Sequence, residues 1–210
     1  MRLVFIDFED SFTNNILSYF DQFDFHIDIV NFRNLSKSNI SDLLENQLVV
    51  LGPGPGHPEE YLKSFVSVGV NFKDELSKAK RIIGICLGHQ LVLNIFDELR
   101  VVRSSRPMHG QAITMKLEED EDLFDCFNRE DRTELIHARL QRYNSLKVEV
   151  DSGEYKSGNK ESLTQFIFDN NDELLMAYRP NFFFTMQFHP ESVGTSCNNI
   201  LFEAMNKFLM

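Results

Sequence analysis

Short apolar runs alternate with segments of helical spacing in the first half of the chain. The runs have the length of buried strands. They cover Val4 to Ile6, Ile27 to Val30, Gln47 to Leu51 and Ile82 to Ile85. From Phe12 to Phe23, apolar side chains recur at spacings of three and four, which indicates an amphipathic helix that Ser11 or Thr13 is placed to cap. Because strands and helices alternate, this half predicts a mostly parallel, doubly wound sheet flanked by helices.

The second half is richer in strand-like segments. The candidates are Gln111 to Leu117, Leu146 to Val150, Gln165 to Asp169, Leu174 to Tyr178 and Phe183 to Phe188. A helix is expected from Asn198 to Leu209, and the polar, turn-rich stretch from Ser152 to Ser162 predicts an exposed loop rather than a linker. We therefore expect one α/β domain over residues 1–210, with strands added to the sheet by the second half.

A Gly-x-Cys-x-Gly pentapeptide, Gly84 to Gly88, directly follows the apolar run Arg81-Ile82-Ile83. Small residues on both sides of a cysteine at a strand end have the spacing of a nucleophile elbow, a strained turn that lifts the central side chain clear of the sheet. The apolar segment Gln90 to Phe96 predicts a buried helix that begins near Cys86. A helix N-terminus favours thiolate over thiol, so Cys86 is a candidate nucleophile.

A thiolate nucleophile also requires a base or cationic partner, and the sequence offers one far downstream. His189 stands in the segment Gln187-Phe188-His189-Pro190-Glu191, where Glu191 is close enough to orient and charge-stabilise the imidazole. The alternative is that Cys86 is an inert core residue, since cysteine is often buried. The flanking glycines, the following helix and the His-Pro-Glu segment favour a Cys86, His189 and Glu191 triad.

Composition narrows the class of protein. The chain has 210 residues and is 42% hydrophobic, which suffices for one core. A net charge of -11 without Lys/Arg runs argues against nucleic-acid binding. Three widely spaced cysteines favour a reducing compartment, and the opening apolar run is too short for a membrane span, so a cytoplasmic protein with no membrane contact is expected. The acidic run Glu118 to Asp122 is interpreted as a solvated turn, and no metal site is assigned.

Six motifs along the chain resemble one family, the class I (triad) glutamine amidotransferases, and within it the glutaminase subunits of anthranilate synthase and aminodeoxychorismate synthase. The resemblance runs nearly end to end. The motifs are Ile6-Asp7 with Asp10 to Thr13, Gly52 to Gly56, Gly84 to Gln90, Met108 to Gly110, Arg142 to Leu146, and Gln187 to Val193. The resemblance implies the class I glutamine amidotransferase fold and an enzyme with a catalytic triad of Cys86, His189 and Glu191.

The resemblance also implies roles for residues around the triad. The loop from Gly52 to Gly56 follows a predicted strand, where glycine and proline can aim a backbone N–H at an oxyanion. In the family the corresponding loop has this role, so the amides of Gly54 and Leu87 are expected to form the oxyanion hole. The residues expected to bind glutamine are Gly54, Gly56, Gln90, Tyr143, Ser145 and Leu146.

As a member of this family, the chain would hydrolyse L-glutamine and deliver ammonia to a chorismate-binding synthase subunit. That partner would hold Mg²⁺, and this chain would hold no cofactor. Anthranilate synthase is favoured over aminodeoxychorismate synthase. A non-catalytic regulatory subunit and a freestanding γ-glutamyl hydrolase remain as alternatives. Three residues depart from the family pattern, namely Asn144 where His is usual, Gln111 where Lys is common, and His57 in place of a small residue.

Overall fold

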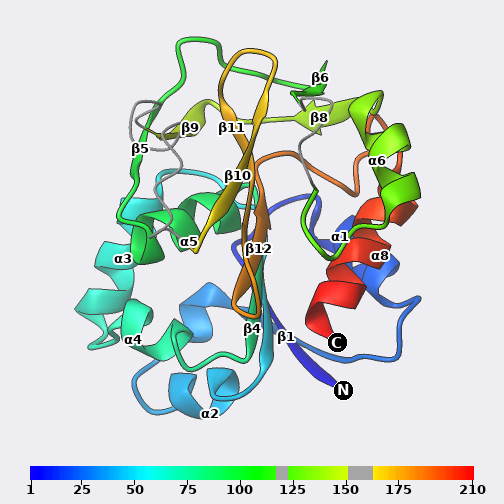
Figure 1. Ribbon diagram of the computed structural model, residues 1–210. Coiled ribbons are helices and arrows are strands. Elements are labelled where there is room, and N and C mark those ends of the chain that lie inside the picture. The colour runs from blue at the N-terminus through cyan, green and yellow to red at the C-terminus, as the bar shows by residue number, and fades with distance from the viewer. Residues whose placement is uncertain (117–122, 151–162) are drawn as a thin grey trace.

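The computed structural model describes residues 1–116, 123–150 and 163–210, and these residues form a sheet of eight strands (Figure 1). The strand order across the sheet is β2 (His26–Asn31), β1 (Arg2–Asp7), β3 (Leu48–Leu51), β4 (Arg81–Ile85), β12 (Phe183–Met186), β11 (Leu174–Arg179), β10 (Gln165–Asp169) and β7 (Met115–Lys116). Strands from β2 to β12 pair in parallel, whereas β11, β10 and β7 are antiparallel additions. The prediction of a mostly parallel sheet with strands added by the second half is confirmed.

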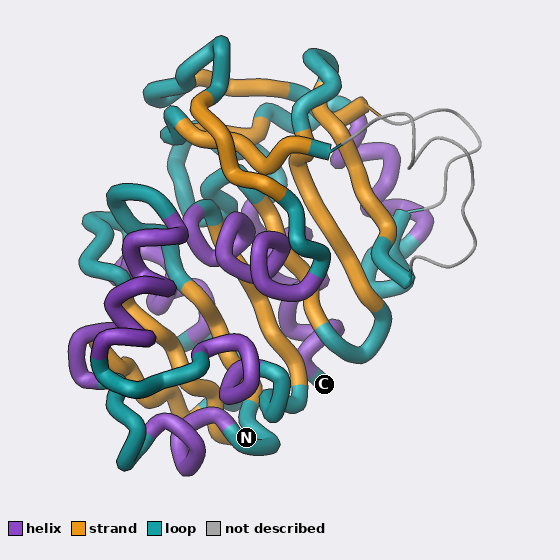
Figure 2. Tube along the Cα trace, turned by 90° about the vertical axis from the view of Figure 1, so that its left-hand side faces the viewer, coloured by secondary structure: helices purple, strands orange, loops and turns teal. Residues whose placement is uncertain are grey.

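Helices cover both faces of the sheet, as Figures 1 and 2 show from perpendicular directions. One face carries α1 (Thr13–Phe20), α6 (Arg129–Ile136) and α8 (Asn198–Leu209). The other carries α2 (Ile40–Leu44), α3 (Pro58–Ser67), α4 (Phe72–Leu76) and α5 (Leu87–Phe96), and a short 3-10 helix, η1 (Phe32–Asn34), follows β2. The expected C-terminal helix is confirmed with the predicted bounds.

The buried strands are apolar on both sides because both faces are covered. In β1, Leu3 and Phe5 pack into the core beneath α1 and α8, whereas Val4 and Ile6 pack into the core beneath α2 to α5. This alternation follows from the two-residue period of a strand, and it explains why β1 appears in the sequence as a continuous apolar run.

Two small antiparallel pairs lie apart from the main sheet, in the upper half of the view in Figure 1. One joins β5 (Arg100–Arg103) to β9 (Leu146–Glu149), and the other joins β6 (Gln111–Ile113) to β8 (Leu140–Arg142). The single strand predicted from Gln111 to Leu117 is therefore wrong. The segment divides at Thr114, because β6 pairs with β8 whereas β7 joins the main sheet beside β10. Periodicity within a segment carries no information about which distant strand will pair with each part.

The first helix also differs from its prediction. It runs from Thr13 to Phe20, and neither Ser11 nor Thr13 caps it, since Phe12 occupies the N-cap position without a side-chain acceptor. The Thr13 hydroxyl instead donates to Asp7 Oδ1 at 2.8 Å, which ties the helix to the end of β1. The backbone N–H of Phe12 donates to Asp10 Oδ1 at 2.8 Å.

Two predicted segments lie outside the residues that the structure describes. They are the loop from Ser152 to Ser162 and the acidic run from Glu118 to Asp122.

The carboxyl ends of β1, β3, β4 and β12 meet at one edge of the sheet because these strands are parallel. This edge is where open α/β proteins bind ligands. The segments that leave it include the Gly-Pro loop after β3, Cys86 after β4 and the His-Pro-Glu segment after β12. In the parts of the chain that the structure describes, no helix combines the length and apolar character needed to cross a membrane.

Candidate active site

Cys86 forms the turn between β4 and α5 and is the N-cap residue of that helix. Its backbone adopts φ 54° and ψ -100°, a left-handed conformation that side-chain-bearing residues rarely adopt. The surrounding structure holds this strain, since the Cys86 N–H donates to the Met186 carbonyl at 2.9 Å. The predicted sharp turn between a strand and a helix is thus present at Cys86.

The glycines on either side of Cys86 are required by close backbone approach. A Cβ at Gly88 would lie 2.1 Å from the Leu51 carbonyl oxygen, and a Cβ at Gly84 would lie 2.7 Å from the Gly88 oxygen. The first turn of α5 therefore packs directly against the ends of β3 and β4. This contact accounts for the small residues on which the sequence prediction of an elbow depended.

His189 lies between Cys86 and Glu191, and all three side chains are nearly or fully buried. Its Nδ1 is 2.6 Å from Glu191 Oε1, so Nε2 is the ring nitrogen left for the hydrogen bond to Cys86. Burial lowers the pKa of His189, but charge and hydrogen bonding from Cys86 and Glu191 oppose burial and prevail, holding the pKa well above its ordinary value of 6.5. The structure thus brings together the three residues predicted from the sequence and favours a protonated imidazole.

Gln187 is a neighbour of Cys86 for which sequence reasoning assigned no role. Its Nε2 donates toward Cys86 Sγ at 3.6 Å, and its Oε1 accepts from Gln90 Nε2 at 3.0 Å. The register explains the contact, because Met186 pairs with Ile85 in the parallel β12–β4 ladder and the next residues then face each other at the strand ends. The contact could not be predicted from the sequence, because it depends on the pairing of β12 with β4 and no local pattern reveals that pairing.

The Gly-Pro loop lies against the start of α5. A Cβ at Gly54 would lie 2.6 Å from Leu87 Cδ2, so the two residues proposed to donate to an oxyanion are in contact. Gly56 has φ +80°, a value that suits glycine. The loop is held to α3 by the Tyr61 hydroxyl, which donates to the Pro55 carbonyl at 2.6 Å.

Aromatic rings border the imidazole of His189. The Tyr143 ring meets it edge-on at a centroid distance of 5.1 Å, and the Phe12 ring lies 5.0 Å from both of them. The Tyr143 hydroxyl is 3.0 Å from Ser192 Oγ. Phe12 was expected only as part of a helix stripe, but its position at the N-cap of α1 turns the ring toward the site. Both rings therefore pack against an imidazole that is 2% exposed.

The remaining residues of the predicted glutamine pocket follow β8. The Leu146 carbonyl lies 3.4 Å from Gln90 Nε2, which joins this segment to α5, and the Ser145 carbonyl accepts from the Ser104 N–H at 2.9 Å. The six predicted pocket residues come from different elements: Gly54 and Gly56 from the loop after β3, Gln90 from α5, Tyr143 and Ser145 from the link between β8 and β9, and Leu146 from β9.

His57 and His89 have positions that the sequence did not indicate. His57 begins α3, where Nδ1 accepts from the Glu59 N–H at 3.2 Å and Nε2 faces the Val101 carbonyl at 3.2 Å. His89 is fully buried, with Nδ1 2.9 Å from the Thr185 hydroxyl. Burial, reinforced by the Arg142 guanidinium, lowers the pKa of His89 to about 3, so this imidazole is neutral at physiological pH.

The other two cysteines have strongly raised thiol pKa values. Cys126 and Cys197 are free thiols, and burial raises the pKa of each to about 12. Among the described residues, no group of three or more His, Cys, Asp or Glu side chains is arranged to hold a metal ion. The contact of Cys86 with an imidazole whose pKa is raised is an arrangement suited to nucleophilic catalysis by cysteine.

Comparison with known proteins agrees with this geometry. The family model described as glutamine amidotransferase class-I matches residues 4–208. Anthranilate synthase component 2 of Saccharolobus solfataricus is 25% identical over 204 residues, which are 96% of this chain and 96% of that protein. The bifunctional protein TrpGD of Thermotoga maritima is 28% identical over 197 residues, covering 92% of this chain, and the chain spans only 30% of that longer protein.

A solved structure shows the same fold. The crystal structure of a glutamine amidotransferase from Thermotoga maritima aligns with a TM-score of 0.59 and 18% identity, covering 91% of this chain and 76% of that one. The match of the family model over nearly the whole chain decides the assignment, and it agrees with the elbow cysteine, the buried His-Glu pair and the parallel sheet. The chain belongs to the class-I glutamine amidotransferase family and is a glutamine amidotransferase.

Proposed function

We propose that the chain is the glutaminase subunit of anthranilate synthase, which hydrolyses L-glutamine at Cys86 and passes the ammonia to a chorismate-binding synthase subunit. The single observation that carries the chemistry is the contact of Cys86 with a buried imidazole whose pKa is raised. A protonated His189 beside the sulfur is the arrangement needed for thiolate attack followed by protonation of a leaving amine.

In the proposed reaction, Cys86 Sγ attacks the side-chain carbonyl carbon of glutamine. The amides of Gly54 and Leu87 stabilise the oxyanion, and one such donor is typically worth about 3 kcal/mol. His189 donates its proton to the departing nitrogen, the C–N bond breaks and ammonia leaves a γ-glutamyl thioester. Water then attacks the thioester, His189 takes a proton from the water, the C–S bond breaks, and glutamate leaves with Cys86 restored as the thiolate.

Binding of glutamine is proposed at the converging segments around Cys86. Gly54, Gly56, Gln90, Tyr143, Ser145 and Leu146 would hold the substrate, and the contact of Gln90 with the Leu146 carbonyl supports one continuous pocket. Glu191 orients His189 through its 2.6 Å contact. Mg²⁺ and chorismate would belong to the partner subunit in this proposal.

The choice of anthranilate synthase is supported by the names of several relatives. Proteins from Saccharolobus solfataricus, Cyanidium caldarium and Methanothermobacter thermautotrophicus that match most of this chain are each described as anthranilate synthase component 2. Free ammonia is largely protonated at neutral pH and is then a poor nucleophile, which gives a physical reason for coupling hydrolysis to a synthase.

The test combines this chain with the chorismate-binding subunit of anthranilate synthase, chorismate and Mg²⁺, and supplies either glutamine or ammonia. The substitution Cys86→Ala should abolish glutamine-dependent anthranilate formation and leave ammonia-dependent formation intact. Cys197→Ala is the matched control and should retain both. A parallel reaction with the aminodeoxychorismate synthase partner identifies the pathway.

Retention of the glutamine-dependent rate in Cys86→Ala would overturn the assignment of the nucleophile. Aminodeoxychorismate as the only product would move the chain to the other synthase. If glutamate is released but neither anthranilate nor aminodeoxychorismate forms, the chain is a glutaminase whose partner is not one of these two synthases. If no glutamate is released in any mixture, a non-catalytic regulatory subunit is favoured.

A further inference from the structure

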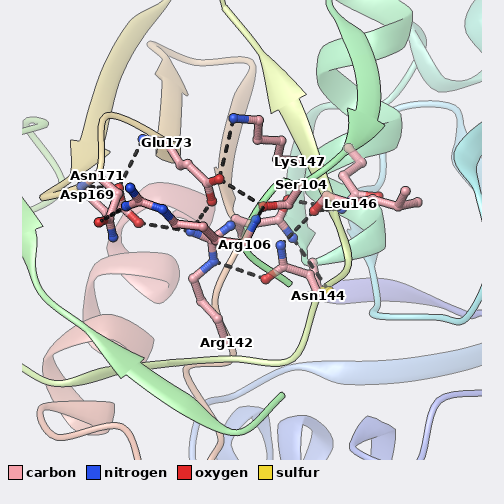
Figure 3. Close-up of polar contacts among 12 residues, drawn as sticks. Ser104, Arg106, Arg142, Asn144, Leu146, Lys147, Asp169, Asn171 and Glu173 are labelled. Atoms are coloured by element: carbon pink, nitrogen blue, oxygen red, sulfur yellow. Dashed lines mark hydrogen bonds and ion pairs between the residues drawn. The ribbon is translucent and has the colours of Figure 1, made fainter. Parts of the chain in front are cut away.

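A cluster of four charged side chains lies behind the pocket segment that follows β8 (Figure 3). Arg142 is fully buried, and its Nη1 is 3.0 Å from Asp169 Oδ2 and 3.0 Å from Glu173 Oε2. Lys147 Nζ lies 3.4 Å from Glu173 Oε1, so two positive charges balance two negative charges. A buried ion cluster of this kind contributes little net stability compared with apolar packing, but it requires one particular geometry.

The cluster is connected to the pocket through Asn144. Arg142 Nε donates to Asn144 Oδ1 at 3.0 Å, and a guanidinium has donors only, so the amide oxygen must face it. The amide nitrogen is thereby directed to the other side, where Asn144 Nδ2 donates to the Leu146 carbonyl at 2.6 Å. The orientation of the Asn144 side chain is set by the cluster rather than by the pocket.

From Leu146 the hydrogen bonds continue to the nucleophile. Gln90 Nε2 lies 3.4 Å from the Leu146 carbonyl and 3.0 Å from Gln187 Oε1, and Gln187 Nε2 donates toward Cys86 Sγ at 3.6 Å. A second connection runs from the cluster to the same segment. Ser104 Oγ donates to Glu173 Oε1 at 2.9 Å, and the Ser104 N–H donates to the Ser145 carbonyl at 2.9 Å.

We propose that Asn144 is a positioning residue that transmits the fixed geometry of the Arg142–Asp169–Glu173–Lys147 cluster to the Leu146 carbonyl, and so sets the shape of the glutamine pocket. This inference rests on the proposed function, because it takes Ser145 and Leu146 as part of that pocket. The side-chain hydrogen bonds of Asn144 go to Arg142 and to the Leu146 carbonyl. Its contribution is to hold the Leu146 carbonyl where Gln90 can contact it, and Gln90 lies on α5, the helix whose N-cap is Cys86.

The test measures glutamine binding in a Cys86→Ala background by titration calorimetry, which separates binding from turnover. Asn144→Asp keeps the acceptor for Arg142 but replaces the donor to Leu146 with an oxygen that faces a carbonyl oxygen. It should weaken glutamine binding about 10-fold or more. Asn144→Leu, which has similar volume and adds no charge, should weaken binding as well.

The matched control is Asn94→Asp. Asn94 lies one turn beyond Gln90 on α5, and its Nδ2 donates to the Leu99 carbonyl at 3.0 Å, so the same substitution breaks the same type of bond without a contact to Leu146. This variant should bind glutamine as the background protein does. Thermal midpoints are recorded for all variants, because a purely structural role would lower the midpoint and leave the dissociation constant of the folded protein unchanged. With Cys86 restored, the KM for glutamine should rise more than kcat falls.

An unaltered glutamine dissociation constant in both Asn144 variants, or an equal loss in Asn94→Asp, would overturn the inference and leave the glutaminase function standing. No glutamine binding in the Cys86→Ala background itself would overturn both. A measurement that needs no Asn144 variant is the side-chain amide resonance of Asn144 in that background. It should shift on addition of glutamine while that of Asn94 does not, and the opposite result would contradict the proposal.

Discussion

His189 Nδ1 lies 2.6 Å from Glu191 Oε1, and both side chains are buried. A carboxylate at this distance stabilises the charged imidazole, and it is one of the causes that hold the pKa of His189 well above 6.5 despite burial. The same contact fixes which ring nitrogen remains for Cys86. The pair therefore sets both the charge and the orientation of the imidazole.

Glu191→Gln should lower the pKa of His189, because a neutral amide no longer stabilises the imidazolium. In the proposed reaction the protonated form donates to the departing nitrogen, so the alkaline limb of the kcat/KM profile for glutamine should move to lower pH. NMR titration of the His189 ring gives the direct measurement. An unchanged alkaline limb together with an unchanged His189 pKa would show that Glu191 does not stabilise the charged ring.

The same pKa shift predicts a pH dependence of stability. His189 has a raised folded-state pKa, so its contribution is fully present below about pH 6.5 and is lost as the pH rises through the folded-state value. Glu191→Gln should reduce this contribution. Urea unfolding of the unaltered and Glu191→Gln proteins at pH 6 and above should therefore give a difference that narrows as the pH rises. A difference that widened would contradict the assigned sign.

His89 predicts the opposite sign. Its folded-state pKa of about 3 lies below the unfolded value of 6.5, so stability is present above pH 6.5 and falls as the pH falls toward 3. Between pH 7 and pH 5 the loss should be about 2 kcal/mol. His89→Gln removes the titrating group, and its unfolding free energy should lack this part of the pH dependence. Equal pH dependence in both proteins would show that folding does not lower the pKa of His89.

Alkylation should distinguish Cys86 from the other two thiols. Burial raises the pKa of Cys126 and Cys197 to about 12, so at pH 7.5 roughly one molecule in 10,000 or fewer carries either thiolate. Iodoacetamide should therefore add once, at Cys86, as seen by intact mass and peptide mapping. Glutamine should slow this reaction by forming the thioester. Faster labelling of Cys197 or Cys126 than of Cys86 would contradict the proposed nucleophile.

Gly88→Ala should damage both stability and activity, because the added Cβ would lie 2.1 Å from the Leu51 carbonyl oxygen. Overpacking against backbone at this distance should cost about 3 kcal/mol or more and displace the turn at Cys86. Gly69→Ala is the control. Its φ is +75° but the nearest atom to its Cβ would be 3.8 Å away, so only the conformational cost of about 1 kcal/mol is expected. Urea unfolding that gave equal losses would show that the close approach at Gly88 is relieved by movement.

Local sequence patterns determined the α/β class and the place of the sharp turn at Cys86, the proposed nucleophile. Apolar runs such as β1 indicate strands buried on both sides, and glycines around Cys86 indicate a backbone that must approach its neighbours closely. The Cys86, His189 and Glu191 set was predictable because parallel strands bring their carboxyl ends to one edge. The C-terminal helix α8 was predictable as well, because its apolar stripe lies within one segment of the sequence.

Tertiary structure alone decided which distant segments meet. The contact of Gln187 with Cys86 depends on β12 pairing with β4, and the division of the segment from Gln111 depends on two different partner strands. Arg142 is buried because Asp169 and Glu173 surround its guanidinium, although neither is near it in the sequence. Charge, spacing and periodicity describe a residue's own segment, whereas burial and hydrogen-bond partners are set by pairing between segments. For this reason the position of Cys86, the proposed nucleophile, was predictable from the sequence, but the hydrogen-bond network around it was not.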